Sequence, residues 1–151
     1  MKETEIDKKK IESLLPHREP MLLIDKLTKI VPLKSATAIM NVKKDGFYVQ
    51  GHFPGQPVMP GVLQVEAMAQ VGGVLVLNTV PDPENYLTFF MKIDNVKFKQ
   101  PVHPGDQLIF KLELITPIRR GICHMKGHTF ANGKLTTEGE LMAQIIRKDN
   151  L

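Results

Sequence analysis

The sequence lacks residues and segments on which several common classes of protein depend. It contains no tryptophan, two tyrosines and one cysteine, Cys123. A single cysteine excludes a disulfide framework or a cysteine metal site within one chain, and its strand-like surroundings predict a free, buried thiol. No apolar run reaches the roughly 18 residues that a membrane-spanning helix needs. Residues 1–12 are highly charged and have no apolar stretch of the kind found in secretory signals, so we expect a soluble cytoplasmic protein.

Motifs that mark several enzyme classes are also missing. There is no G-x-S-x-G nucleophile turn, no phosphate-binding P-loop, no G-x-G-x-x-G and no H-E-x-x-H. The histidines are scattered along the chain without the grouping of metal ligands, so we expect no metal site. Repeats and linkers are absent, and the length suits one domain over residues 1–151. Residues 1–10 are expected to form a charged and frayed start, with a short helix through Leu15 as the alternative.

The charge is unevenly distributed along the chain. Residues 1–90 hold ten basic and ten acidic side chains, and residues 127–151 hold three of each. Residues 91–126 hold seven basic against three acidic side chains, which accounts for the whole net charge of +4. Such a stretch suits an anionic partner, although a solvated strand face has the same composition. No nucleic-acid-binding motif accompanies the charge, so nucleic acid is disfavoured as the partner.

Hydrophobic periodicity predicts one long helix and about six strands. Residues 61–78 are apolar almost all round, which is typical of a helix buried inside a domain. Asn132-Gly133 predicts a tight hairpin turn, and His103-Pro104-Gly105-Asp106 predicts another turn. The sequence therefore predicts an α+β fold in which a curved, mainly antiparallel sheet surrounds one helix. Strands are expected at residues 21–31, 35–42, 87–98, 107–116, 121–130 and 135–146.

A loop with a constrained backbone precedes the predicted helix. Residues 51–61 contain three prolines and three glycines, which fix the path of the chain. His52 is the one side chain in this loop that accepts a proton near neutral pH, which suits a general base. On the residues alone, a histidine that caps a backbone carbonyl is an equal alternative.

The predicted helix carries a carboxyl group on an otherwise apolar surface. Glu66 shares a face with Gln70, four residues further on. Because burial favours the neutral form of a carboxyl group, Glu66 suits a general acid; a buried glutamate satisfied by backbone donors is the alternative. The free N–H groups of Gly61 and Val62 can hold a carbonyl or enolate oxygen at the helix start. These groups together suit loss of a proton beside a thioester carbonyl and departure of a β-hydroxyl.

The same segments carry a resemblance to a known family over roughly residues 10–147. The chain resembles the 3-hydroxyacyl-[acyl-carrier-protein] dehydratases of bacterial type II fatty-acid synthesis. The motifs that carry the resemblance are, in order, Leu15-Pro16-His17-Arg18, Gly51-His52-Phe53-Pro54-Gly55, Met59-Pro60-Gly61-Val62-Leu63, Glu66-Ala67-Met68-Ala69-Gln70 and Pro104-Gly105-Asp106.

The resemblance implies a hot-dog fold and a specific reaction. The reaction is the reversible dehydration of (3R)-3-hydroxyacyl-[acyl-carrier-protein] to the trans-2-enoyl form in fatty-acid elongation. The family forms dimers that assemble into hexamers, with His52 as the base in one subunit facing Glu66 as the acid in the other. Gly61 and Val62 are expected at the thioester carbonyl. The phosphopantetheine arm belongs to the carrier-protein substrate, so no separate cofactor is implied.

Further site residues follow from the resemblance. Aromatic residues of a mobile loop often gate the acyl tunnel in this family, so Phe89 and Phe90 are candidate gates, with core packing as the alternative. Phe53 and Pro60 are expected to line the tunnel, and His17 is expected to be structural. Acyl carrier protein is strongly acidic, which gives the basic stretch a partner. The expected docking residues are Lys92, Lys97, Lys99, Arg119, Arg120 and Lys126.

Three alternative functions stay open at this point. The bifunctional dehydratase/isomerase branch of the same fold carries Asp at the position of Glu66, so Glu66 favours dehydration alone. A hot-dog thioesterase would hydrolyse the thioester, but the His-Phe-Pro-Gly loop does not belong to those enzymes. A non-catalytic acyl-carrier-binding module would have no need of an intact His52 and Glu66 pair.

Overall fold

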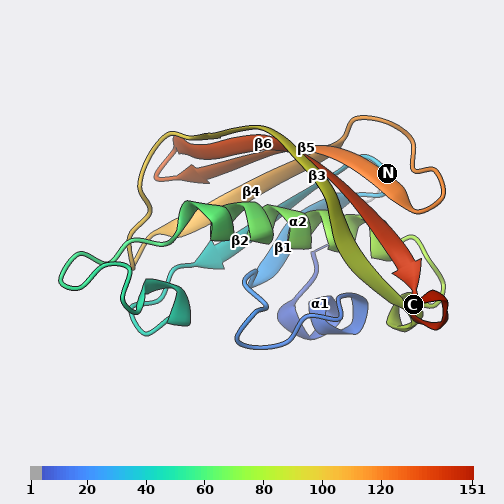
Figure 1. Cartoon of the computed structure of the whole chain (residues 1–151), viewed down its shortest axis with the longest axis horizontal. Helices are drawn as coiled ribbons and strands as arrows, with labels where there is room; N and C mark the ends of the chain where they lie inside the picture. The colour runs from blue at the N-terminus through green and yellow to red at the C-terminus, as the bar shows by residue number, and fades with distance from the viewer. Residues whose placement is uncertain (1–4) are drawn as a thin grey trace.

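The computed structural model describes residues 5–151, which form one sheet around one long helix (Figure 1). Residues 1–4 of the predicted frayed start lie outside the described residues. None of the helices in the described part combines the length and apolar character needed to cross a membrane. The helices and strands are α1 (Lys8–Leu14), β1 (Lys26–Val31), β2 (Ser35–Asn41), α2 (Gly61–Leu77), β3 (Tyr86–Phe98), β4 (Gln107–Leu114), β5 (Ile122–Ala131) and β6 (Lys134–Arg147), with 3-10 turns at Phe47–Val49, Pro83–Asn85 and Lys148–Asn150.

The sheet has six strands in the order β1-β2-β4-β5-β6-β3, and every neighbouring pair is antiparallel. It curves over α2, while α1 packs on the other side of the helix (Figure 1). This arrangement confirms the predicted α+β hot-dog fold. The sheet leaves two edges, and the edge formed by β3 is the longer one, at 13 residues.

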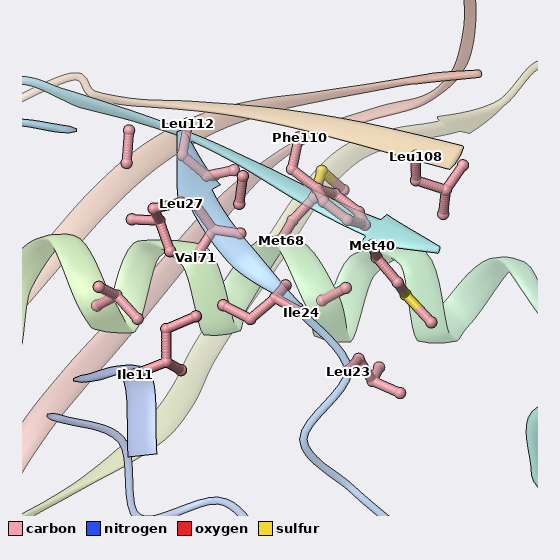
Figure 2. Packing of buried hydrophobic residues seen from close by; sticks show 14 of the residues in the cluster. Ile11, Leu23, Ile24, Leu27, Met40, Met68, Val71, Leu108, Phe110 and Leu112 are labelled. Atoms are coloured by element: carbon pink, nitrogen blue, oxygen red, sulfur yellow. The ribbon is translucent and has the colours of Figure 1, made fainter. Parts of the chain in front are cut away.

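The core lies between α2 and the inner face of the sheet. Twelve of the 17 residues of α2 are buried, which confirms the helix predicted from its all-round apolar surface. Figure 2 shows Met68 and Val71 of α2 directed towards Phe110 and Leu112 of β4. Gly72 allows the sheet to come close, because a Cβ atom there would lie 2.4 Å from the sulfur of Met125.

The hairpin between β5 and β6 follows its predicted turn. Asn132 and Gly133 both have positive φ angles, 53° and 76°, which are those of a type I′ turn. The turn before β4 is present as well, because the amide of Asp106 donates to the carbonyl of His103 at 3.1 Å. Local turn chemistry therefore sets the register of the last strands.

The prediction of a strand over residues 21–31 is wrong in its first half. β1 begins at Lys26, and the preceding residues cross the surface of α2 as extended chain outside the sheet. The reason is that Leu23 donates its backbone N–H to the side chain of Gln70 at 2.9 Å instead of to a neighbouring strand. Upstream, Ile6 is buried and its backbone pairs with that of Leu27, and α1 follows at once with Asp7 as its N-cap.

Candidate active site

His52 is held by its own loop. The Nδ1 atom of its ring lies 2.8 Å from the carbonyl oxygen of Val58, and its ring stacks on Phe53 with centroids 4.1 Å apart. A carbonyl oxygen can only accept, so Nδ1 carries the proton and Nε2 keeps its lone pair. The carbonyl-capping role considered for His52 is therefore present, and it prepares the other ring nitrogen to accept a proton.

The start of α2 lies in the same cavity as His52. An open cavity of about 360 Å³ is lined by His52, Gly61, Val62 and Lys99, among others. Among the described residues, neither Gly61 nor Val62 donates its N–H to a backbone carbonyl outside the helix, and the helix geometry gives these first donors no partner inside it. The ring of Phe98 covers Gly61 so closely that a Cβ atom there would lie 2.6 Å from it. The His52 ring and the free N–H groups at the start of α2 thus line one cavity.

Glu66 lies one and a half turns into α2 and faces a different cavity. This cavity, of about 50 Å³, is lined by Glu66, Gln70, His17 and Cys123, among others. The Glu66 side chain is 22% exposed, so it is only partly buried. It is satisfied by a side chain rather than by the backbone donors of the alternative interpretation, since Gln70 Nε2 donates to Glu66 Oε2 at 2.9 Å.

Gln70 is itself fixed by the backbone of the extended chain before β1. Its Oε1 accepts the N–H of Leu23 at 2.9 Å, and its Nε2 donates to the carbonyl of Met21 at 2.9 Å. These two partners determine which end of the amide is oxygen and which is nitrogen. The second hydrogen of Nε2 therefore points at Glu66, as the four-residue spacing on one helix face predicted.

The structure of one chain does not bring His52 and Glu66 into a common cavity. Each lines a separate hollow, and no residue lines both. The sequence could not decide between a site within one chain and a site shared by two chains, and in the single chain the two residues line two separate cavities.

The predicted tunnel residues divide between the surroundings of Glu66 and those of His52. Phe89 and Phe90 of β3 line the Glu66 cavity and are 43% and 40% exposed, so they are not packed in the core. Phe53 lies on the His52 ring and is 54% exposed. Pro60 is the residue that precedes α2, and it is half-buried.

The predicted docking residues do not form a single patch on one chain. Lys99 lines the His52 cavity, whereas Lys92 lies 3.1 Å from the carboxylate of Asp94 on β3. Arg120 lies in the turn between β4 and β5, where its carbonyl accepts the amide of Gln144 from β6. Arg119 lies beside Arg120 in the same turn. In the sheet, Lys97 lies opposite Glu138, and Lys126 lies opposite Glu113 and Glu140.

Cys123 is buried as predicted, and it lines the wall of the Glu66 cavity. Burial raises the pKa of its thiol from 9.0 to about 11. The thiol is therefore protonated near neutral pH, where the reactive thiolate is scarce. This argues against a nucleophilic role and for a role in packing.

Sequence reasoning missed two contacts that bridge distant parts of the chain. Val58 was not identified as the partner of His52, and His17 was assigned a structural role only. His17 lines the Glu66 cavity, and its Nε2 lies 3.6 Å from Glu66 Oε2. The two residues are far apart in the sequence, so no local pattern relates them. The short segment Leu15-Pro16-His17-Arg18 was the one available signal.

Comparison with known proteins places this site in a family. The family model of the FabA-like domain matches residues 15–140. The 3-hydroxyacyl-[acyl-carrier-protein] dehydratase FabZ of Geobacter metallireducens is 46% identical, over 99% of both chains. The chain therefore belongs to the FabA-like family and, within it, to the FabZ-type dehydratases.

Two other comparisons extend this result. The bifunctional enzyme LpxC/FabZ of Bacteroides thetaiotaomicron is 53% identical over 97% of this chain, and the chain spans about a third (32%) of that relative's length. Among solved structures, the dehydratase heterocomplex ApeI:P of Xenorhabdus doucetiae matches with a TM-score of 0.79 and 18% identity, over 92% of each chain. At that identity the structural match supports the hot-dog fold alone.

Proposed function

We propose that this protein catalyses the reversible dehydration of (3R)-3-hydroxyacyl-[acyl-carrier-protein] to trans-2-enoyl-[acyl-carrier-protein] in fatty-acid elongation. The close FabZ relatives, whose names give this dehydratase activity, support the reaction class. The observation that carries the residue assignment is the orientation of His52 beside the helix start. Its Nδ1 is bound to a carbonyl, and its Nε2 has no hydrogen-bond partner among residues 5–151.

In the proposed reaction His52 Nε2 removes the proton from the carbon next to the thioester carbonyl. The N–H groups of Gly61 and Val62 hold the carbonyl oxygen as it gains negative charge. Glu66 donates its proton to the β-hydroxyl group, the carbon–oxygen bond breaks, and water leaves as the double bond forms. His52 ends with one more proton and Glu66 with one fewer, and exchange with water restores both. No cofactor beyond the substrate's own phosphopantetheine arm is needed.

We propose further that the site is completed by two subunits, with His52 of one facing Glu66 of the other. Support comes from the separation of the two residues within one chain and from the β3 edge. A long edge strand with exposed apolar side chains suits pairing with a second copy. Those on β3 are Phe89, Phe90, Met91, Ile93 and Phe98, between 40% and 55% exposed. The expected assembly is a trimer of such dimers.

The same arrangement would gather the basic side chains around each site. Lys97 and Lys99 lie at the His52 end of β3, whereas Arg119 and Arg120 lie towards the end that carries Phe89. If the β3 strands of two subunits pair antiparallel, Lys97 and Lys99 of one subunit meet Arg119 and Arg120 of the other at the entrance of each shared site. We propose that the acidic carrier protein docks there, with Phe89 and Phe90 gating the acyl tunnel. The cytoplasm is the expected location.

A direct turnover assay tests the proposed function. Pure protein is incubated with 3-hydroxyacyl carrier protein, and the conjugated enoyl thioester is followed by absorbance and by mass spectrometry of the carrier. Loss of one water, reversible from the enoyl side, is the expected result. A further shift of the double bond would indicate a dehydratase/isomerase, and free acid would indicate a thioesterase. Binding without chemical change would leave a carrier-binding module.

Subunit mixing tests whether the site is shared. His52→Ala and Glu66→Ala should each fold, bind carrier and lose dehydration. Random exchange of the two inactive proteins yields mixed dimers in which one of the two sites has both residues, so about a quarter of wild-type activity is expected to return. No return of activity after exchange has been demonstrated would contradict a shared site and support one within the chain.

A further inference from the structure

The two oxygens of the Glu66 carboxyl group have unequal surroundings. Oε2 accepts a hydrogen bond from Gln70 at 2.9 Å and lies 3.6 Å from His17 Nε2. Among residues 5–151, none forms a hydrogen bond with Oε1. In a neutral carboxyl group the carbonyl oxygen is the stronger hydrogen-bond acceptor, so the donor at Oε2 favours placing the proton of Glu66 on Oε1.

The surroundings of His17 determine which of its nitrogens carries hydrogen. Nδ1 is buried and has no hydrogen-bond partner among the described residues. A buried N–H without an acceptor is rarer and more costly than an acceptor without a donor, so Nδ1 is the unprotonated nitrogen. The hydrogen of the neutral ring is then on Nε2, and Nε2 is the atom that faces Glu66.

The backbone around His17 holds the ring in this place. Arg18 Nη1 donates to the carbonyl of Leu15 at 2.9 Å and to that of His17 at 2.8 Å. Leu15 is buried in the core at 2% exposure. The side chain of Arg18 therefore closes the short segment Leu15-Pro16-His17 onto itself, which restrains the backbone that carries the imidazole.

We propose that His17 is a positioning residue for the dehydration, which acts with Gln70 on Oε2 of Glu66 so that the transferred proton sits on Oε1 and points at the leaving hydroxyl. The proposal rests on the proposed role of Glu66 as the acid. The 3.6 Å separation is slightly longer than a hydrogen bond, and such contacts tighten when substrate fills the site. His17 does not touch the reacting atoms in this mechanism.

Three substitutions of His17 separate positioning from packing. His17→Leu removes the donor, His17→Gln places an amide N–H near the position of Nε2, and His17→Asn places one near that of Nδ1. We expect His17→Leu and His17→Asn to lower kcat about tenfold or more with KM within twofold, because a small displacement of a catalytic group has large effects on rate. His17→Gln should recover most of the rate. The matched control is His128→Leu, since His128 pairs with Glu138 at 3.8 Å on the outer face of the sheet.

The Glu66→Gln background separates this inference from the proposed function. We expect Glu66→Gln to be inactive and His17→Leu to cause no further loss in it, because residues that act as a unit are not additive. Full activity in His17→Leu beside an inactive Glu66→Gln would overturn the positioning role alone. Activity in Glu66→Gln would overturn the proposed acid itself. Equal losses in all three His17 variants, in step with a lowered melting temperature, would show that His17 only packs.

Discussion

Gln70 offers the strongest test of how this site is built, because its side chain joins the helix, the extended chain before β1 and Glu66. Replacing it with leucine keeps the volume and removes three hydrogen bonds. Two of the partners left behind are backbone groups, the buried N–H of Leu23 and the partly buried carbonyl of Met21. An unpaired polar group costs about 1–3 kcal/mol when buried, and a partly buried one lies at the lower end of that range. Two fully buried groups would cost about 2–6 kcal/mol together. Against a gain of about 1 kcal/mol from the more apolar side chain, Gln70→Leu should lower the free energy of unfolding by about 1–5 kcal/mol, and the partial burial of the Met21 carbonyl favours the lower part of this range.

The matched control is Gln64→Leu on the same helix. Gln64 is 2% exposed, about as buried as Gln70, but its Oε1 accepts from two side-chain hydroxyls, those of Thr136 and Thr137. Hydroxyls rotate to other acceptors, and Thr136 already contacts the carbonyl of Thr129 at 3.1 Å. The loss for Gln64→Leu should therefore be smaller, about 1–2 kcal/mol.

Urea unfolding at one fixed protein concentration measures both losses, because the apparent stability of the proposed oligomer would depend on concentration. The midpoint should fall further for Gln70→Leu than for Gln64→Leu, with similar slopes. Turnover should fall sharply in Gln70→Leu, because Glu66 loses its donor. If the two variants unfold at the same urea concentration, the backbone contacts of Gln70 do not carry the stability that the distances indicate.

Three further predictions concern other parts of the molecule. Because burial raises the pKa of Cys123 to about 11, the folded thiol should react slowly with alkylating reagents at pH 8 and quickly in urea. The unfolded thiol ionises first, so stability should decline between pH 9 and 11 and decline less in Cys123→Ser. Gly61→Ala should displace the Phe98 ring, which its Cβ would approach to 2.6 Å, and a loss of turnover without a comparable loss of carrier binding is expected. Lys99→Glu should raise KM for the carrier-bound substrate and weaken its salt dependence, whereas Lys9→Glu on α1 should change neither.

The parts of the fold that depend on local pattern could be predicted from the sequence. The apolar surface of residues 61–78 predicted α2, which ends one residue earlier, at Leu77. The Asn132-Gly133 turn was predicted because its positive φ angles favour those two residues. Residues 21–25 were mistaken for strand because an extended apolar segment looks the same whether it pairs with a strand or with a glutamine side chain.

For the candidate site as well, local patterns could be predicted from the sequence and tertiary contacts could not. His52 and Glu66 were identified because a titratable group in a rigid loop or on an apolar helix is chemically unusual wherever the chain places it. The contact of His17 with Glu66 and the hydrogen bond from His52 to Val58 depend on tertiary packing, so the sequence pattern did not reveal them. Tertiary contacts determine which ring nitrogen of His52 is left to accept a proton and which carboxyl oxygen of Glu66 accepts a hydrogen bond.

The geometry of α2 explains why His52 and Glu66 line separate cavities in one chain. From Gly61 to Glu66 the helix advances five residues, which is about 7.5 Å along its axis and about 140° around it. A carbonyl group bound at the helix start, beside His52, therefore lies on a different side of α2 from the Glu66 carboxyl group. In the proposed dimer a two-fold axis relates the α2 helices of the two subunits. The start of α2 in each subunit then faces the Glu66 carboxyl group of the other. Lengthening the helix by one residue between Gly61 and Glu66 would rotate Glu66 by about 100° and should abolish both sites at once.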